Sequence, residues 1–172
     1  SRGPRVGEPL SRRRLALLTG PQDMSSGRAR LAGAREALAA AGLDHEGLVV
    51  AFGDYSEDSG ERAMRDALAA GPVPDAVFAS SDLMAVGALR VRRQAGLRVP
   101  DDVALVGFDD SAVCRHTDPE LTSVHQPIEE MGRVMADLLL GRIGGDAGQH
   151  PCANRQASVR NRARRQLRRC RR

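Results

Sequence analysis

Short apolar runs alternate with amphipathic stretches along most of this chain. Four runs are typical of buried strands, at residues 15–18 (LALL), 47–52 (GLVVAF), 75–79 (DAVFA) and 103–107 (VALVG), and a shorter fifth covers 121–124. Between them, apolar residues recur at three- and four-residue spacing, which is typical of helices that bury one face. The alternation predicts an α/β fold in three αβα layers, with a parallel sheet covered by helices on both faces.

Four helices are expected, at about 26–41, 56–70, 82–95 and 128–140. Ser25 or Ser26 can cap the first helix and Ser56 the second, while Gly42 and Gly96 stand where helix-ending glycines belong. From Gly141 the periodicity stops, and we expect the segment GRIGGDAGQH to be a loop.

Composition limits the classes of protein that need to be considered. At 172 residues the chain suits one domain with a substantial core. It has no run of 18 apolar residues, which argues against a membrane-spanning helix. Three unevenly spaced cysteines match neither a disulfide framework nor a metal site, so a reducing cytoplasm is the simplest expectation.

The net charge of +4 hides an uneven distribution. All 26 basic residues are arginine, and nine of them lie in residues 150–172, which contain no acidic residue. Residues 15–149 hold 12 arginines against 21 acidic residues, so the body of the chain is acidic. A basic DNA-binding face is therefore not expected of the fold itself. DNA binding through the arginine-rich end should ignore sequence and weaken steeply with salt.

Polar residues follow each of the first four predicted strands. They are Thr19–Gly20, Asp54–Tyr55, Ser80 to Asp82 and Asp109–Asp110, with Arg28 and Arg30 in the helix after the first strand. Ligands of open α/β sheets bind beyond the carboxyl ends of the strands. An arginine fork, carboxylate acceptors and one aromatic ring suit a ligand rich in hydroxyl groups. The sequence therefore predicts a small-molecule cleft.

Each candidate residue also has a purely structural interpretation. Asp82 can favour a helix dipole, and Ser81 can cap the same helix. Arg30 can pair with Asp23 or Glu36 on the surface, Tyr55 can lie at the edge of the core, and Asp110 can be a turn residue. The convergence of these residues on one sheet edge is what favours a binding cleft.

Catalysis is less well supported by the residues. No nucleophile elbow, phosphate-binding loop, HExxH or CxxC motif occurs, and the chain contains no lysine. Asp109 and Asp110 could hold Mg²⁺, but the lysine of phospho-acceptor domains is missing. His116 and His125 lack an obvious Ser or Cys partner, and we interpret His125 as a structural histidine. We expect no enzyme activity, no metal and no cofactor.

Several stretches in this order resemble the effector-binding domain of the lactose/galactose repressor (LacI/GalR) family of bacterial transcription regulators. They are LALLTGP, RARLAGAREALAAAGL, GDYS, PDAVFASSDLMAVGALRVRRQAGLRVPDDVALVGFDD and DPELTSVHQPIEEMGRVMADLLLGRI. Together they cover about residues 15–143, and residues 75–126 are highly specific. The resemblance implies a two-lobed, periplasmic-binding-protein-like domain whose Rossmann-like or flavodoxin-like lobes close on a small effector.

The resemblance also implies roles for single residues. Arg30 is expected to contact the effector, Tyr55 to stack on it, and Asp109 to accept hydroxyl or ring N–H groups. Ser81 and Asp82 occupy the positions of the family's usual Asn–Asp pair, and the missing Asn amide leaves the ligand open between a sugar and a nucleoside-like molecule. The helix at 83–94 and the loop around residue 114 resemble parts of the family's dimer interface.

The resemblance divides the chain into four parts. Residues 1–14 are expected to be an unstructured or partial leader, 15–126 the C-terminal lobe, 127–143 a helix that crosses to the other lobe, and 144–172 a disordered tail. The family's N-terminal helix-turn-helix has no counterpart here. Of the family's usual last strand, only the residues VRN match. We therefore expect a truncated regulator.

Three functions follow as hypotheses. The first is the effector-sensing lobe of a cytoplasmic regulator that binds operator DNA as a homodimer, through a helix-turn-helix outside this chain and without a membrane partner. The second is the periplasmic sugar-binding protein of an ABC transporter, which would need a signal peptide or lipid-attachment cysteine. The third is an enzyme with a flavodoxin-like core.

Overall fold

The computed structural model describes residues 14–43 and 47–143. In chain order its elements are β1 (Leu15–Thr19), α1 (Ser25–Ala40), β2 (Val49–Phe52), α2 (Glu57–Ala69), β3 (Ala76–Ala79), α3 (Asp82–Gln94), β4 (Ala104–Asp109), the 3₁₀ helix η1 (Ala112–His116), β5 (Thr122–His125) and α4 (Ile128–Ile143). Strand and helix alternate as the apolar pattern predicts. Within the described residues, no helix is long and apolar enough to cross a membrane.

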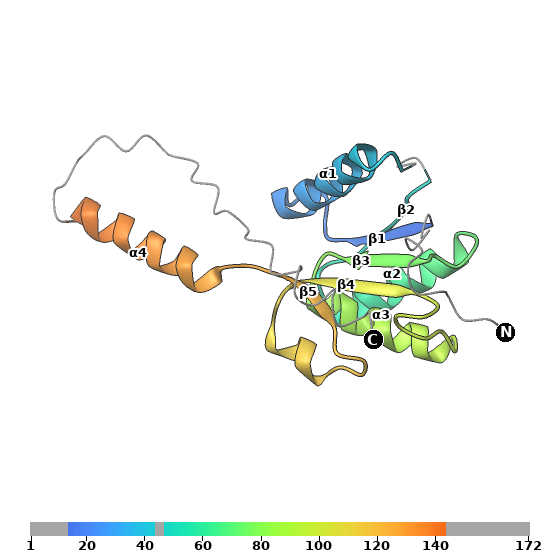
Figure 1. The fold of residues 1–172 in the computed structure, drawn as a ribbon. Coiled ribbons are helices and arrows are strands. Elements are labelled where there is room, and N and C mark those ends of the chain that lie inside the picture. The colour runs from blue at the N-terminus through green and yellow to red at the C-terminus, as the bar shows by residue number, and fades with distance from the viewer. Residues whose placement is uncertain (1–13, 44–46, 144–172) are drawn as a thin grey trace.

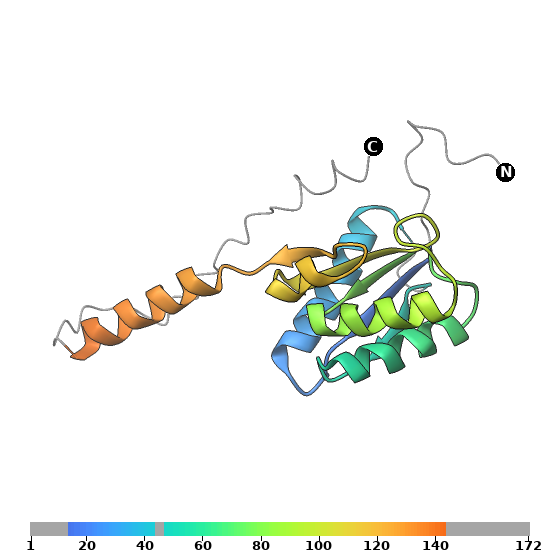
Figure 2. The ribbon, with the colours of Figure 1, turned by 90° about the horizontal axis from the view of Figure 1, so that it is seen from below.

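The five strands form one parallel sheet in the order β2-β1-β3-β4-β5. Helix α1 lies on one face and helices α2 and α3 lie on the other (Figures 1 and 2). The predicted three-layer α/β fold is thus confirmed. Because all strands run in one direction, their carboxyl ends meet at one edge, where the loops leading into α1, α2, α3 and η1 gather.

The end of β4 differs from the sequence prediction. The strand continues two residues beyond Gly107, and Asp109 pairs in register with His125 of β5. Asp109 is therefore the last residue of the strand rather than part of the following loop. Helix η1 was not predicted, because a single 3₁₀ turn carries no periodic apolar signal.

Most helix ends lie at the capping residues that the sequence predicts. The Ser56 side chain caps α2 by accepting from the backbone N–H of Ser59, and Gly42 and Gly96 adopt left-handed φ after α1 and α3. The predicted serine cap of α1 is wrong: Met24 holds the N-cap position, without a side-chain cap bond. Helix α4 continues to Ile143, so residues 141–143 are not loop. Its three extra residues are compatible with the helix, since only Gly141 is a poor helix former.

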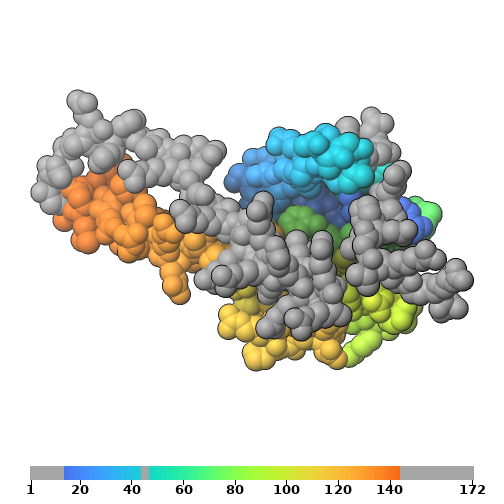
Figure 3. Space-filling view, viewed as in Figure 1, coloured from blue at the N-terminus to red at the C-terminus, as the bar shows by residue number. Residues whose placement is uncertain are grey.

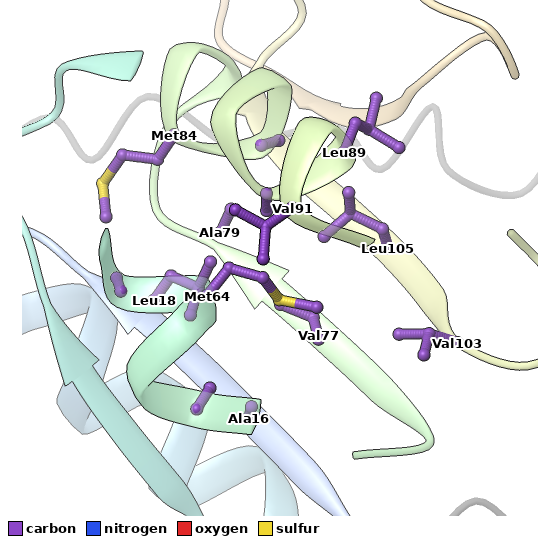
Figure 4. Close-up of a cluster of buried hydrophobic side chains, with 14 of the residues drawn as sticks. Ala16, Leu18, Met64, Val77, Ala79, Met84, Leu89, Val91, Val103 and Leu105 are labelled. Carbon is purple, nitrogen blue, oxygen red and sulfur yellow. The ribbon is translucent and has the colours of Figure 1, made fainter. Parts of the chain in front are cut away.

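The core lies between the sheet and the α2–α3 layer (Figure 4). Leu18, Met64, Met84 and Val103 are almost completely buried there. Two glycines bring α2 and α3 together: a Cβ on Gly60 would lie 2.2 Å from the Met84 carbonyl oxygen, and one on Gly87 would lie 2.1 Å from the Glu57 carbonyl oxygen. The close approach of the two helices requires residues without side chains at both positions.

Helix α1 packs less tightly than α2 and α3. Its one buried residue is Gly27, while the predicted inward residues Leu31, Ala34 and Leu38 are half-buried. Ala41, also predicted to face inward, is exposed. A cavity of about 790 Å³ separates this helix from the sheet. One face of the sheet is therefore only partly covered.

Helix α4 extends away from the sheet and leaves its side chains in solvent (Figure 3). None of its residues is buried. Its exposed large apolar residues are Ile128, Met131, Met135, Leu138, Leu139, Leu140 and Ile143. The proposed packing of this helix on a second lobe stays a prediction.

The predicted leader and tail fall on residues 1–13 and 144–172, which lie outside the described part of the chain. Arg14, the last residue of the predicted leader, is described and donates from its backbone N–H and its guanidinium to the Asp75 carboxylate.

Replacing Gly87 by alanine is expected to lower the free energy of unfolding by about 1–3 kcal/mol, because the new methyl group collides with the Glu57 backbone. Urea unfolding followed by circular dichroism measures the change. Gly132→Ala on α4 is the matched control, since nothing lies within 4 Å of its Cβ position. A Gly87→Ala protein as stable as wild type would contradict the packing described.

The apolar stripe of α4 is expected to make the chain self-associate, because large exposed apolar patches drive association. Replacing both Met135 and Leu139 by glutamate should shift the chain towards monomer in light scattering across a concentration series. Val73→Gln, which removes an exposed apolar side chain elsewhere, should not. A wild-type chain that stays monomeric at every concentration would refute the expectation.

Candidate functional site

The guanidinium of Arg30 lies at the carboxyl edge of the sheet and joins three elements. Its Nη1 donates to the Ser80 carbonyl oxygen after β3, at 2.6 Å. Its Nη2 lies 3.8 Å from Oδ1 of Asp109 at the end of β4. The guanidinium carbon is 4.2 Å from the ring centroid of Phe108 and 5.4 Å from that of Tyr55. The structure therefore brings Arg30, Tyr55 and Asp109 together.

Tyr55 reaches this position from the loop between β2 and α2. Its backbone adopts a left-handed φ of 71°. Its hydroxyl lies 2.9 Å from Oγ of Ser26 in the first turn of α1. A Cβ on Gly20 would lie 2.1 Å from the tyrosine ring, so the glycine after β1 leaves room for the ring. The ring is half-buried against the core and borders the Arg30 guanidinium.

The Asp109 carboxylate is partly accessible, with its side chain 33% exposed. Its Oδ1 accepts from Nε2 of Gln126, at 2.5 Å, just after β5. Burial raises the pKa of Asp109, whereas Arg30 and Gln126 act in the opposite direction. Burial is the larger effect. The Asp109 carboxylate can therefore accept hydrogen bonds, but its surroundings disfavour its negative charge.

Ser81 and Asp82 are buried next to these residues. The Ser81 hydroxyl caps α3 by accepting from the Met84 backbone N–H and also donates to the Tyr55 carbonyl oxygen. Asp82 is 1% exposed, and both of its carboxylate oxygens accept from serines of neighbouring elements. Direct contact of Ser81 and Asp82 with a ligand stays a prediction, while the structure gives both a clear structural role.

The other candidates make local contacts. Arg28 is exposed and donates to the carbonyl oxygens of Gln22 and Asp23, away from the cluster of Arg30. Asp54 is exposed, and hydrogen bonds from Ser56 lower its pKa to about 2. Asp110 has a left-handed φ of 56°, and its Oδ2 lies 2.9 Å from Nδ1 of His125. Both residues therefore have a local structural role at the turn after β4.

Phe108, Gln126 and Ser26 belong to the cluster and were not predicted as site residues. Gln126 directly follows β5, so the same strand-end argument, applied to the fifth strand, would have found it. Phe108 precedes Asp109 in the strand, and its alternating position in the sheet places it on the Arg30 side. The sequence carries no comparable signal for Ser26.

The cavity beside α1 meets this cluster at one end only. Ser26, Arg30, Phe108 and Gln126 line that end, and most other lining residues are apolar. A hydroxyl-rich ligand therefore fits the rim better than the interior of the cavity. Within residues 14–43 and 47–143, no group of three His, Cys, Asp or Glu side chains is placed to hold a metal ion. The arrangement can bind and orient a polar ligand.

Asp109→Asn is expected to raise the free energy of unfolding at pH 7. Because the folded-state pKa of Asp109 is raised, its stabilising contribution is present below the unfolded pKa and is lost as pH rises through the folded pKa. The gain from the substitution should therefore shrink in urea unfolding at about pH 4. Asp54→Asn is the matched control with the opposite sign, since its lowered pKa stabilises the fold at pH 7. An Asp109→Asn protein less stable than wild type at pH 7 would contradict the burial argument.

Comparison with known proteins identifies the family. Residues 10–163 match the model of the periplasmic binding protein-like domain. The HTH-type transcriptional regulator CelR of Thermobifida fusca is 56% identical over 134 residues, which are 78% of this chain and 39% of that protein. The ribose operon repressor of Escherichia coli is 41% identical over 130 residues, 76% of this chain and 39% of that protein. The chain thus spans about two fifths of the length of these relatives.

Solved structures agree with this assignment. A complex of the transcriptional regulator CelR with cellobiose superposes with a TM-score of 0.76 at 55% identity, covering 79% of this chain and 42% of that one. The Lac repressor bound to ONPG gives a TM-score of 0.73 at 34% identity, covering 81% and 42%. These matches confirm the resemblance carried by the strand-end motifs. The chain belongs to the periplasmic binding protein-like domain family, in the form found in LacI-family transcriptional regulators.

Proposed function

We propose that this chain is the effector-sensing lobe of a LacI-family transcriptional regulator and that its effector is a sugar. The observation that carries the proposal is the cluster at the carboxyl edge of the sheet. There the Arg30 guanidinium is held within 3.8 Å of Asp109 and borders the Tyr55 ring. Donor, acceptor and aromatic surface lie within the span of one small molecule.

The chemistry of each group suits a sugar. An arginine fork donates to neighbouring hydroxyl oxygens, and a carboxylate accepts from hydroxyl groups. Gln126 adds an amide that can donate and accept. An aromatic ring covers the apolar C–H face of a pyranose. Arg30, Asp109 and Gln126 contact the hydroxyl groups in this proposal, and Tyr55 contacts the ring face.

The relatives favour a sugar over a nucleoside-like effector. A regulator 55% identical to this chain has been solved in complex with cellobiose, and a LacI family regulator of Enterococcus faecium with ribose bound. Cellobiose is therefore the first candidate. Ser81 is already engaged as a helix cap. In this proposal the polar contacts to the sugar therefore come from Arg30, Asp109 and Gln126.

In the whole regulator, the effector would bias a closure equilibrium between two lobes and thereby change operator affinity in a homodimer. Operator DNA would be bound by a helix-turn-helix elsewhere in the polypeptide. A protein acting on operator DNA works in the cytoplasm. The proposal assigns no catalytic step and no cofactor, because the site offers binding groups without an activated nucleophile.

Transport is the second candidate class, since solute-binding proteins share this fold. The two relatives named above are a transcriptional regulator and an operon repressor, which favours regulation. No contact in the described structure favours transport.

Arg30→Ala is expected to weaken cellobiose binding by this chain, which in this proposal supplies one wall of the cleft. Saturation-transfer difference NMR on the sugar measures the binding, with ribose and adenosine as further ligands. Loss of a charge-assisted contact costs about 1.5–3 kcal/mol, or roughly 10- to 150-fold in affinity. Arg28→Ala is the matched control, because that arginine lies two residues away and, within the described part of the chain, donates to the local carbonyl groups of Gln22 and Asp23.

Equal binding by Arg30→Ala and wild type would overturn the site. Binding of adenosine but not of the sugars would overturn the choice of effector class.

A further inference from the structure

The last residue of β4 and the residue after it adopt an unfavourable backbone conformation. Asp109 has a φ of 123° and Asp110 a φ of 56°, although neither is glycine. Residues in such regions are strained and persist only where the surroundings hold them. The turn that presents the Asp109 carboxylate to Arg30 therefore needs an anchor.

A buried hydrogen-bond cluster supplies this anchor, and its centre is Asp82 at the start of α3. Oδ1 of Asp82 accepts from the Ser123 hydroxyl at 2.5 Å. Oδ2 accepts from the Ser111 backbone N–H at 2.7 Å and from the Ser111 hydroxyl at 2.8 Å. The Ser123 hydroxyl in turn accepts from the Asp110 backbone N–H at 3.0 Å. Both sides of the strained turn are thus tied to one carboxylate.

The cluster surrounds a buried acceptor with hydrogen-bond donors. Asp82 is 1% exposed, and no salt bridge to it occurs among the described residues. A buried carboxylate without a cation is tolerated only where hydrogen bonds compensate for lost water, and Asp82 receives three of them. The Cys114 thiol also faces this carboxylate. Burial, together with the carboxylate, raises the pKa of the thiol to about 12 and keeps the thiol protonated. The Ser111 hydroxyl, the Ser123 hydroxyl and the Cys114 thiol can therefore all donate to the Asp82 carboxylate.

We propose that Asp82 is a positioning residue of the effector site, which acts through Ser111 and Ser123 to hold the 109–110 turn so that Asp109 faces Arg30. The expected consequence of replacing Asp82, a loss of effector affinity, rests on the proposed function. The proposal assigns Asp82 no contact with the effector. This role also explains why the Asp82 carboxylate is buried, with both oxygens engaged in hydrogen bonds, although Asp82 lies close to Ser80 at the end of β3.

Two variants separate this role from direct contact. Asp82→Asn replaces one carboxylate oxygen by an amide NH2 group, which donates hydrogen bonds and cannot accept them from the serines. Ser123→Ala keeps the Asp82 charge but removes the relay to the Asp110 backbone. Ser59→Ala is the matched control: like Ser123, Ser59 is buried and its hydroxyl accepts from a backbone N–H, but it lies at the start of α2 and donates to the Ser56 carbonyl oxygen.

The first arm of the experiment needs no effector. The titration of the Asp109 carboxyl carbon is followed by NMR in the full chain. Ser123→Ala should shift the pKa of Asp109 downward, because release of the turn lets water reach a group whose pKa burial raises. Ser59→Ala should leave that titration in place. An unchanged titration in Ser123→Ala overturns the proposal, whether or not any sugar binds.

The second arm is a double-mutant cycle on cellobiose affinity. Asp82→Asn alone should weaken binding about 3- to 10-fold, as expected for a lost buried hydrogen bond. In an Asp109→Ala background the same substitution should have no further effect, because its action passes through Asp109. Additive effects would show that Asp82 contacts the sugar directly and would overturn the proposal. Absence of cellobiose binding by wild type would count against the proposed function alone, since the titration arm still decides the role of Asp82.

Discussion

The hydrogen bond from Arg30 to the Ser80 carbonyl oxygen is the interaction on which the candidate site depends. It fixes the guanidinium of a loosely packed helix against the end of β3, at the middle of the sheet. Once held there, the guanidinium can border Phe108 and Tyr55 and approach Asp109. The parallel register of the strands makes this possible, because it brings the ends of β1, β3 and β4 to one edge.

The two faces of the sheet are packed differently. Helices α2 and α3 approach each other through Gly60 and Gly87 and build a tight core. Helix α1 buries only Gly27, and a cavity lies beneath it. The site therefore combines strand ends and the start of α3, which lie against the tight core, with Arg30 on the loosely packed helix α1. Such a combination suits a binding site whose ligand completes the packing, since segments with few buried contacts reorganise at low cost.

Much of the fold and part of the site could be predicted from the sequence. The alternation of apolar runs and helical periodicity predicts the sheet. The strand ends, together with the start of the helix after the first strand, predict Arg30, Tyr55 and Asp109 as neighbours. The role of Asp82 could not be predicted in this way, because an acidic residue at a helix start serves equally as a dipole partner, a ligand contact or a buried anchor. Its partners Ser111 and Ser123 lie 29 and 41 residues away, so the distinction depends on tertiary contacts.

Element boundaries were missed where tertiary pairing or weak local signals decide them. Pairing with His125 extends β4 to Asp109, and the Ser26 hydroxyl bonds Tyr55 instead of capping α1. Asp109 itself has two unfavourable features: burial raises its pKa, and its φ of 123° is strained. Both features are explained if the position is kept for binding rather than for stability.

The most direct test of this account is a crystal structure of the chain grown with cellobiose. The account predicts the sugar at the carboxyl edge of the sheet, with hydroxyl groups on the Arg30 guanidinium and the Asp109 carboxylate and a ring face against Tyr55. A sugar bound inside the apolar cavity beneath α1, or on the far edge of the sheet, would contradict it.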